Sequence, residues 1–274
     1  MEFAKNSFSK RCACMLRVDA RRMLRSRLFY IMIAAALLVP VVMTVMLVMM
    51  DGQESVDQQT GEVTIMEGPD SVWQSIGTLP SSEGASADAA AMGGGMDVMA
   101  MCNINMAFMG VAVFVCLFIC DDFRSGYAKN LFTVRAARGE YVLSKTVMGA
   151  LCGALMLVAY FIGAMLAGGI TGLSFAMVGG MSAFSVVMCL LSKILLMLVF
   201  VPIFVTISVA AKSRAWLAIC GSLGGGMLLF MMVGLITPLT ATFINVALCA
   251  AGGAMFAFGL GAISRVILRK TALV

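Results

Sequence analysis

A charged segment of the chain, residues 121–145, lies between two long stretches that carry no charge. Residues 101–120 before it and residues 146–176 after it contain no Asp, Glu, Lys or Arg. About 20 predominantly apolar residues suffice for a helix to cross the hydrocarbon core of a bilayer. The pattern therefore predicts two membrane-spanning helices joined by a polar connection at a membrane surface. The composition agrees, because 61% of the residues are apolar and only 12% are charged, against about half and about a quarter in soluble domains.

The whole chain is predicted to be an all-α integral membrane protein with six transmembrane helices. The predicted spans are residues 28–50, 99–120, 142–166, 186–210, 215–236 and 240–263. Residues 1–27 are basic and have apolar residues at helical spacing, which predicts an amphipathic interfacial helix in the headgroup layer. The apolar run that follows is longer than the core of a signal peptide and has no convincing cleavage site, so we interpret it as an uncleaved first span.

The segments between the spans differ in charge. Residues 51–98 contain nine acidic residues and no basic one, and residues 56–66 within them could form a short hairpin turning at Thr60-Gly61. Every Lys and Arg except Lys193 falls in residues 1–27, the charged segment, residues 211–214 or the tail 264–274. Cytoplasmic loops are enriched in basic residues, so both termini and the connection 121–141 are predicted to be cytosolic. The acidic loop, the turn and partial helix at 167–185, and the turn at 237–239 are then extracellular.

Several chemistries are excluded by composition. The chain has no histidine, which removes His-based acid–base catalysis and His metal sites. It has no G-x-x-x-x-G-K-[ST] motif, so we expect it neither to bind ATP by that device nor to be an enzyme. Most of the nine cysteines lie in or beside apolar runs, where free cysteine behaves as a small apolar residue. We expect no metal, no cofactor and no nucleic acid to bind this chain.

Apart from Lys145 at the start of the third predicted span, Lys193 is the one charged residue inside a predicted span. It either lines a polar part of a translocation path or extends its ammonium to the outer interface. A Ser-Lys hydrolase using Ser185 or Ser192 is disfavoured, because adjacent residues on a helix do not face each other. The absence of carboxylates from the spans also argues against a proton- or sodium-coupled carrier. The Gly149/Gly153 spacing predicts close helix packing within the chain, or alternatively a dimer seam.

The order of residue types in the charged segment is more specific. An acidic pair ends the second span, F-R-S-G follows, then a Lys-Asn-Leu stretch, an Arg-Gly-Glu step and Ser-Lys at the start of the third span. This order resembles the permease subunits of ABC-2 type transporters. The residues in the corresponding places are Asp121, Asp122, Gly126, Arg138 and Lys145. Tyr127 departs from the pattern, because a small or β-branched residue is expected there.

The rest of the layout also resembles that family. The basic amphipathic helix resembles its elbow helix, and the large external loop is similar to the branch of multidrug, sodium and lantibiotic-immunity exporters. The resemblance implies that a cytosolic ATP-binding subunit, which holds ATP and Mg²⁺, docks at the charged segment, and that two permease chains, as a homo- or heterodimer, enclose a path through the bilayer. It implies export of an amphiphilic compound across a bacterial cell membrane. The implied coupling residues are Asp121, Asp122, Arg124, Gly126, Arg138, Gly139, Glu140 and Lys145.

Two other functions are compatible with the sequence. A non-transport membrane assembly factor or sensor subunit would use the acidic loop and need no ATPase. A secondary carrier would lose transport when an ion gradient collapses and would work without ATP, but the missing membrane carboxylates disfavour it.

Overall fold

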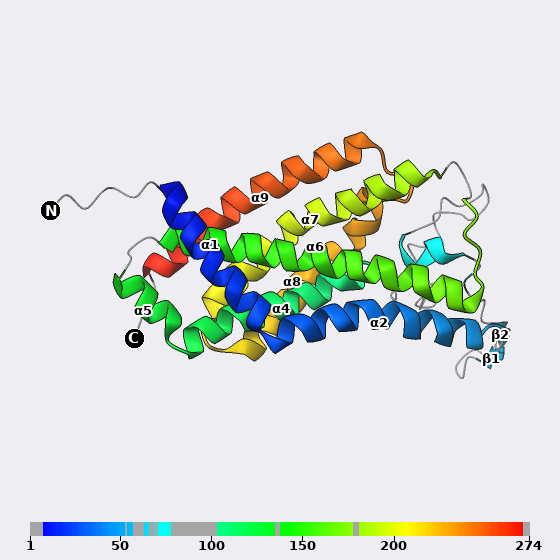
Figure 1. The fold of residues 1–274 in the computed structure, drawn as a ribbon, viewed down its shortest axis with the longest axis horizontal. Coiled ribbons are helices and arrows are strands. Elements are labelled where there is room, and N and C mark those ends of the chain that lie inside the picture. The colour runs from blue at the N-terminus through cyan, green and yellow to red at the C-terminus, as the bar shows by residue number, and fades with distance from the viewer. Residues whose placement is uncertain are drawn as a thin grey trace.

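The computed structural model describes residues 8–52, 54–56, 63–65, 69, 71–77, 103–134, 138–177 and 181–270. Most of the described residues belong to long helices that run side by side in a bundle (Figure 1). The helices are α1 (Phe8–Arg25), α2 (Arg27–Met49), α4 (Met106–Arg124), α5 (Tyr127–Val134), α6 (Arg138–Thr171), α7 (Ala183–Ala211), α8 (Ala215–Ile236) and α9 (Phe243–Lys270). The smaller elements are β1 (Glu54–Val56), β2 (Val63–Ile65) and the 3-10 helix η1 (Val72–Ser75).

The two ends of the bundle differ in what they carry (Figure 1). The beginning of α1, the short helix α5 and the last turns of α9 lie together at one end, which we call the basic end. Strands β1 and β2 lie at the opposite end, which we call the far end. They form the antiparallel hairpin that the sequence predicted, with Glu54 opposite Ile65 and Val56 opposite Val63. The predicted turn at Thr60-Gly61 and most of the loop 51–98 lie outside the described residues.

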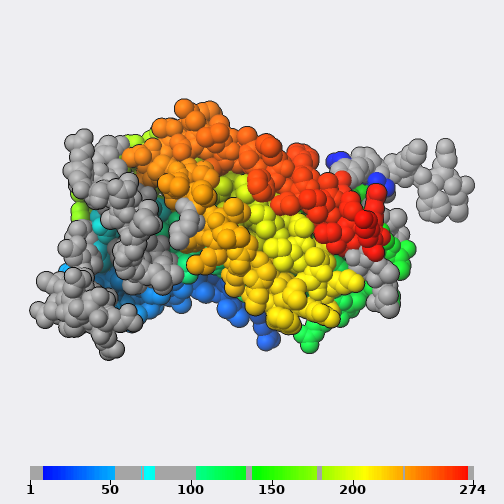
Figure 2. Space-filling model, turned by 180° about the vertical axis from the view of Figure 1, so that it is seen from behind, coloured from blue at the N-terminus to red at the C-terminus, as the bar shows by residue number. Residues whose placement is uncertain are grey.

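Five helices in the described part are long and apolar enough to cross a membrane, namely α2, α4, α6, α7 and α9. Helix α8 contains a shorter apolar stretch, Ala215–Phe230. Large apolar side chains remain exposed along α8 and α9, which cover the face seen in Figure 2; Leu228 is 82% exposed and Phe258 is 83% exposed. Apolar helix surfaces of this kind fit lipid contact, because a bilayer interior solvates them.

The core is built where α4, α6 and α7 meet. The rings of Phe108 on α4 and Phe200 on α7 lie 4.7 Å apart between centroids. A Cβ atom at Gly149 would lie 2.7 Å from Val201 Cγ1, and one at Gly153 would lie 2.9 Å from Met197 Sδ. The two glycines therefore let α6 approach α7 closely, which confirms that this spacing serves packing within the chain.

Helix α2 packs along α6, and the two helices approach closely at Gly163. A Cβ atom there would overlap the backbone carbonyl of Leu37 and would lie 2.7 Å from Pro40 Cγ. Because Pro40 has no N–H, its place inside α2 leaves one carbonyl of that helix without its usual donor. Only a residue without a side chain fits on α6 opposite these two residues.

Several helices have bounds that differ from the predicted spans, and α6 runs from Arg138 to Thr171 where the span 142–166 was predicted. Helix α4 begins at Met106 rather than near 99 and continues to Arg124, past the charged pair that was expected to end it. Helix α9 extends to Lys270, into the predicted tail 264–274, because Leu268 is buried against the core. At the C-terminal ends of α4 and α9 the cause is the same, because charged residues stay helical where the helix continues to pack inside the protein.

The predicted partial helix at 173–185 is not formed by the described residues before α7. Residues 173–177 are not helical: Ser174 forms an isolated bridge with Ser71, the Val72 N–H donates to the Ser174 carbonyl at 3.2 Å, and the Trp73 indole N–H donates to the Phe175 carbonyl at 3.4 Å. Helix α7 starts at Ala183 with a capping box between Ser182 and Ser185. The polar atoms that a helix would have used are thus engaged by η1.

Candidate coupling region at the basic end

The connection from α4 to α5 is a tight turn built by its own sequence. The Ser125 hydroxyl donates to the Asp121 carbonyl at 2.7 Å, which covers the end of α4. Gly126 follows with φ of +74°, a left-handed conformation that glycine adopts without a steric penalty. The Asn130 N–H then donates to the Gly126 carbonyl at 3.0 Å and starts α5. The chain therefore changes direction within two residues.

Helix α5 has one buried face and one polar face. Ala128 and Phe132 are buried, and the Phe132 ring meets the Tyr141 ring edge-on with 5.3 Å between centroids. Lys129, Asn130 and Thr133 are exposed. The short helix is therefore anchored to the first turn of α6 and presents a polar face at the basic end of the bundle.

Four charged side chains meet beneath this connection, and we call them the buried charge cluster: Asp19, Arg22, Asp122 and Lys145. The Lys145 ammonium lies 2.9 Å from Asp19 Oδ1 and 2.7 Å from Asp122 Oδ2. Arg22 Nη2 lies 2.6 Å from Asp122 Oδ1, and its Nη1 lies 3.8 Å from Asp19 Oδ1. Two cations and two anions balance, so the cluster as a whole carries no net charge.

Neutral donors complete the cluster. The Tyr141 hydroxyl donates to Asp122 Oδ2 at 3.0 Å, and the Ser144 hydroxyl donates to Asp19 Oδ2 at 2.6 Å. Both carboxylates and Lys145 are essentially inaccessible to solvent. Removing one partner from a buried ion pair leaves an uncompensated charge and costs about 3–5 kcal/mol. The cluster therefore fastens α1 to both α4 and α6.

A second ion pair covers the start of α6. Arg11 Nε lies 2.9 Å from Glu140 Oε1, and the Glu140 side chain is 5% exposed. On the neighbouring residue, a Cβ atom at Gly139 would lie 2.7 Å from Arg265 Nε on α9. The first turn of α6 is thus enclosed by α1 on one side and by α9 on the other.

The cluster shifts the pKa values of two groups at its edge. Burial alone would lower the pKa of Arg22, but the charge and hydrogen bond of Asp122 outweigh it, and the pKa is raised. Burial raises the pKa of Tyr127, and the nearby Asp19 carboxylate adds to this effect while Arg22 opposes it. The Arg22 guanidinium lies 4.2 Å from the centre of the Tyr127 ring. The ring of Tyr127, the residue that departs from the family pattern, thus packs against the Arg22 guanidinium.

The predicted coupling residues therefore fall into two groups. Asp121 and Arg124 are exposed, Arg138 and Gly139 are half-buried, and Gly126 forms the turn. In contrast, the side chains of Asp122, Glu140 and Lys145 are buried, so they are not accessible to another protein in this structure. Their direct role is to hold α1, α4 and α6 together.

Sequence reasoning missed Asp19 and Arg22. The signal was present, because Asp19 is the one acidic residue of a helix rich in arginine and lies four residues from both Met15 and Met23. Met15, Asp19 and Met23 share one helical face, and all three are buried. An acid on the apolar face of a basic helix predicts a cationic partner elsewhere in the chain.

Lys193 lies at the other half of the bundle and has no part in the cluster. It is fully buried, and its ammonium donates to Asn105 Oδ1 at 2.7 Å and to Thr237 Oγ1 at 3.0 Å. The interpretation that it extends to the outer interface is therefore wrong. Asn105 precedes α4 and Thr237 ends α8, so Lys193 links α7 to both. No carboxylate of the described residues lies within ion-pair distance of it.

The Ser-Lys pairing considered from the sequence is not formed. The Ser185 hydroxyl donates to the Ser182 carbonyl at 2.9 Å and accepts from the Ser182 N–H. Ser192 is buried on the turn of α7 that carries Lys193, but no hydrogen bond joins the two. Neither serine is placed as a nucleophile activated by the lysine.

An apolar crevice opens between α2 and α4, with α6 as its floor. Its volume is about 280 Å³, and methionines from three helices contribute to it, namely Met32, Met106, Met109 and Met156. Methionine side chains adapt readily to apolar ligands of different shapes.

Comparison of the chain with known protein families identifies the family to which it belongs. The family model described as "ABC-2 family transporter protein" matches residues 20–228, from within α1 to within α8. The chain belongs to the ABC-2 transporter family. No curated protein and no solved structure matches the chain. The ABC-2 protein is thus a multi-pass membrane component of a transporter, of a kind that works with an ATP-binding subunit and is not itself the nucleotide-binding enzyme.

Proposed function

We propose that this ABC-2 protein is the membrane-spanning permease of an exporter and that the exposed face of α5 docks the ATP-binding subunit. The observation that carries the proposal is the position of α5 between α4 and α6, both of which are long enough to cross a membrane. A force applied to α5 acts on the ends of two spanning helices at once. Lys129, Asn130 and Thr133, with Asp121 and Arg124 beside them, supply the polar docking surface.

The packing around α5 supports transmission of that force. Phe132 contacts Tyr141 on α6, and the buried charge cluster joins α6 to α4 and α1. A displaced α5 would therefore move three helices together instead of bending one loop. Polar contacts on the rim of an interface mainly set orientation and association rate. This suits a partner that must dock in one orientation and change its conformation with each cycle of ATP binding.

The topology proposed from the charge pattern fits this arrangement. Helix α8 would be the fifth of six spans, which places the basic end with both termini in the cytosol and the hairpin β1–β2 outside. Basic residues on α1, α5 and α9 and in the connection of α7 to α8 favour that orientation. ATP and Mg²⁺ would belong to the partner, and two permease chains would enclose the path in a bacterial plasma membrane.

The substrate that we propose is an amphiphilic compound. The crevice between α2 and α4 is lined almost entirely by apolar atoms, and Gly110 and Ala36 keep it open. Such a surface takes an acyl chain or an apolar drug or peptide side chain and gives no site for a small inorganic ion. Lys193, buried in the far half, is the residue that we propose to lie nearest the translocation path.

The test is recovery of the ATP-binding subunit with the tagged permease in mild detergent. We expect wild type to retain that subunit at about equal stoichiometry and Lys129→Glu to retain about tenfold less, because like charges at an interface cost several kcal/mol. Arg214→Glu is the matched control, since Arg214 is an exposed cation at the same end but lies outside α5. It should retain the subunit as wild type does.

Three results would contradict parts of the proposal. Equal retention by Lys129→Glu and Arg214→Glu would remove α5 as the docking site. A folded wild-type permease that recovers no ATPase would favour an assembly factor or sensor. Transport in vesicles that continues without ATP and stops when an ion gradient collapses would favour a secondary carrier.

A further inference from the structure

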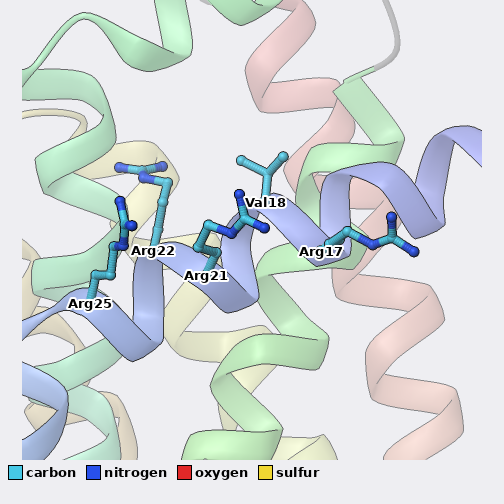
Figure 3. A pocket seen from close by; sticks show the side chains of 5 residues that line it. All are labelled: Arg17, Val18, Arg21, Arg22 and Arg25. Atoms are coloured by element: carbon cyan, nitrogen blue, oxygen red, sulfur yellow. The ribbon is translucent and has the colours of Figure 1, made fainter.

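The outward face of α1 carries a groove that shares only Arg22 with the buried charge cluster. It has a volume of about 250 Å³ and is lined by Arg17, Val18, Arg21, Arg22 and Arg25 (Figure 3). These positions recur three and four residues apart and therefore share one side of the helix. We call this feature the arginine groove. In Figure 3 the side chains of Arg22 and Arg25 extend in nearly the same direction, with Val18 and Arg21 one turn further along.

Most of the positive charge in the groove is not neutralised by the protein. Arg22 pairs with Asp122, and Asp19, the one acid on α1, points inward to Lys145. Within the described part of the chain no carboxylate lies within 4.0 Å of a guanidinium of Arg17, Arg21 or Arg25. Like charges on successive turns repel one another. An anion bound between them would relieve that repulsion.

The groove lies at the depth where a bilayer presents phosphate groups. Helix α2 begins at Arg27, with Ser26 alone between it and the end of α1. Its apolar side chains are exposed from the first turn, since Tyr30 is 58% exposed and Ile31 is 61% exposed. Its 23 residues extend about 35 Å, close to the roughly 30 Å of a hydrocarbon core. The start of α2 therefore marks the edge of the core, and Arg25 and Arg21 lie just outside it.

The chemistry of the groove suits a phosphodiester. An arginine presents paired N–H groups in a planar fork that matches two phosphate oxygens. Arg22 is already held in place by Asp122 and by the Tyr127 ring, so little conformational freedom is lost there on binding. Val18, exposed between the arginines, and Leu24 on the flank offer apolar contact to the glycerol and the first carbons of an acyl chain. Charge and apolar contact together favour a lipid over a free anion.

We propose that the arginine groove binds the headgroup of an anionic phospholipid in the leaflet at the basic end. Arg17, Arg21 and Arg25 supply the charge, and Arg22 forms the fixed side of the site. Because the cluster fastens α1 to α4 and α6, the bound lipid fixes the depth at which this helix assembly lies in the membrane.

The experiment is a titration of delipidated full-length protein in detergent with phosphatidylglycerol, or with phosphatidylcholine of the same acyl chains, and counting of bound lipids by native mass spectrometry. Wild type should bind a first phosphatidylglycerol at about tenfold lower concentration than phosphatidylcholine. The triple variant Arg17→Gln, Arg21→Gln, Arg25→Gln should lose that preference. The matched control Arg214→Gln, Arg269→Gln, Lys270→Gln removes three exposed cations from the same end and should keep it.

Additional variants and a competition experiment distinguish a lipid from other anions. Replacement of the same three arginines by lysine should give a preference between those of wild type and of the triple glutamine variant, because the charge remains while the paired N–H geometry is lost. Displacement of phosphatidylglycerol from wild type by millimolar inorganic phosphate would overturn the lipid assignment, as would equal lipid binding by the two triple glutamine variants. A groove variant that keeps its lipid preference but loses the ATP-binding subunit would show that the groove contacts that protein instead.

Discussion

Arg22 on α1 reaches Asp122 at the end of α4, with 2.6 Å between Nη2 and Oδ1. This contact joins the amphipathic helix to the connection that leads into α5. It also explains why Asp122 remains helical at the end of a membrane-length segment, since its charge is met inside the protein by Arg22 and Lys145. The polar end of the bundle is therefore a packed structure and not a set of solvated loops.

The first prediction concerns Lys145. Lys145→Met should lower the free energy of unfolding by about 3 kcal/mol, because two buried carboxylates lose a shared cation. Asp19→Asn added to Lys145→Met should cost much less than the sum of the two single changes, because the second change removes one of the stranded charges. Chemical unfolding in detergent measures both. Lys129 is an exposed cation on α5 and serves as the control. Lys129→Met should change the free energy of unfolding by less than about 0.5 kcal/mol. If the changes in the free energy of unfolding of the two single variants simply added in the double variant, Asp19 and Lys145 would not interact as the distances indicate.

The second prediction separates Arg138 from Glu140. Glu140→Lys should destabilise the protein, because it places a cation against Arg11 in a nearly inaccessible position. The swap Arg11→Glu with Glu140→Lys should recover part of the loss. Arg138→Glu should leave the unfolding transition close to wild type, since Arg138 is only half-buried, its cation lies 6.0 Å from the Phe132 ring, and it forms no ion pair with the residues that the structure describes. Thermal unfolding of the four proteins gives the comparison. A stable Glu140→Lys protein would contradict the pairing.

The positions of most helices could be predicted from the sequence, because apolar length is a local property. Helix α8 has the same bounds as the predicted segment 215–236, and α2 and α7 differ from their predicted segments by a few residues. The β1–β2 hairpin was visible in the same way. The resemblance to the ABC-2 family was drawn from the order of residue types in the charged segment, which is also local, and the family model matches residues 20–228.

The burial of individual charges could not be predicted in this way. Asp19 and Lys145 are 126 residues apart, and no periodicity in either segment records that they meet. The charged segment was therefore interpreted as one exposed surface, although Asp122, Glu140 and Lys145 face inward. Similarly, the carbonyls of Ser174 and Phe175 accept hydrogen bonds from η1, a partner that the composition of residues 173–177 does not reveal. Long-range pairing decided each of these cases.

The third prediction concerns Gly126. A Cβ atom there would meet nothing within 4 Å, so any effect of a substitution must come from its φ of +74°. Gly126→Ala should cost roughly 1–2 kcal/mol, and Gly126→Asn should cost less, because asparagine tolerates the left-handed conformation. Gly169 on α6 is the control, since it also faces open space but has an ordinary helical φ. Gly169→Ala should be neutral or slightly stabilising. Unfolding midpoints of the three variants test the order, and equal losses for alanine and asparagine would point to a cause other than backbone strain.

The last prediction concerns Lys193. A lysine costs at most about 2.5–3.5 kcal/mol on insertion scales, the value for the centre of a spanning helix. Lys193 lies in the far half of α7, where two neutral oxygens, Asn105 Oδ1 and Thr237 Oγ1, offset part of that cost. Lys193→Met should therefore change the free energy of unfolding by less than about 1 kcal/mol, because the lost hydrogen bonds and the removed charge act in opposite directions. Asn105→Ala alone should be more harmful, since it leaves the ammonium with one fewer acceptor.

The double variant Asn105→Ala, Lys193→Met should have a free energy of unfolding close to that of Lys193→Met alone. Unfolding in detergent and ATP-driven transport in vesicles should be measured on the same preparations. If Lys193→Met keeps its stability but loses transport, the lysine serves the translocation path, because a purely structural link would not separate the two measurements. A loss of several kcal/mol would instead show that the link between α7, α4 and α8 depends on the charge, and that two neutral acceptors compensate a buried ammonium more fully than insertion energies indicate.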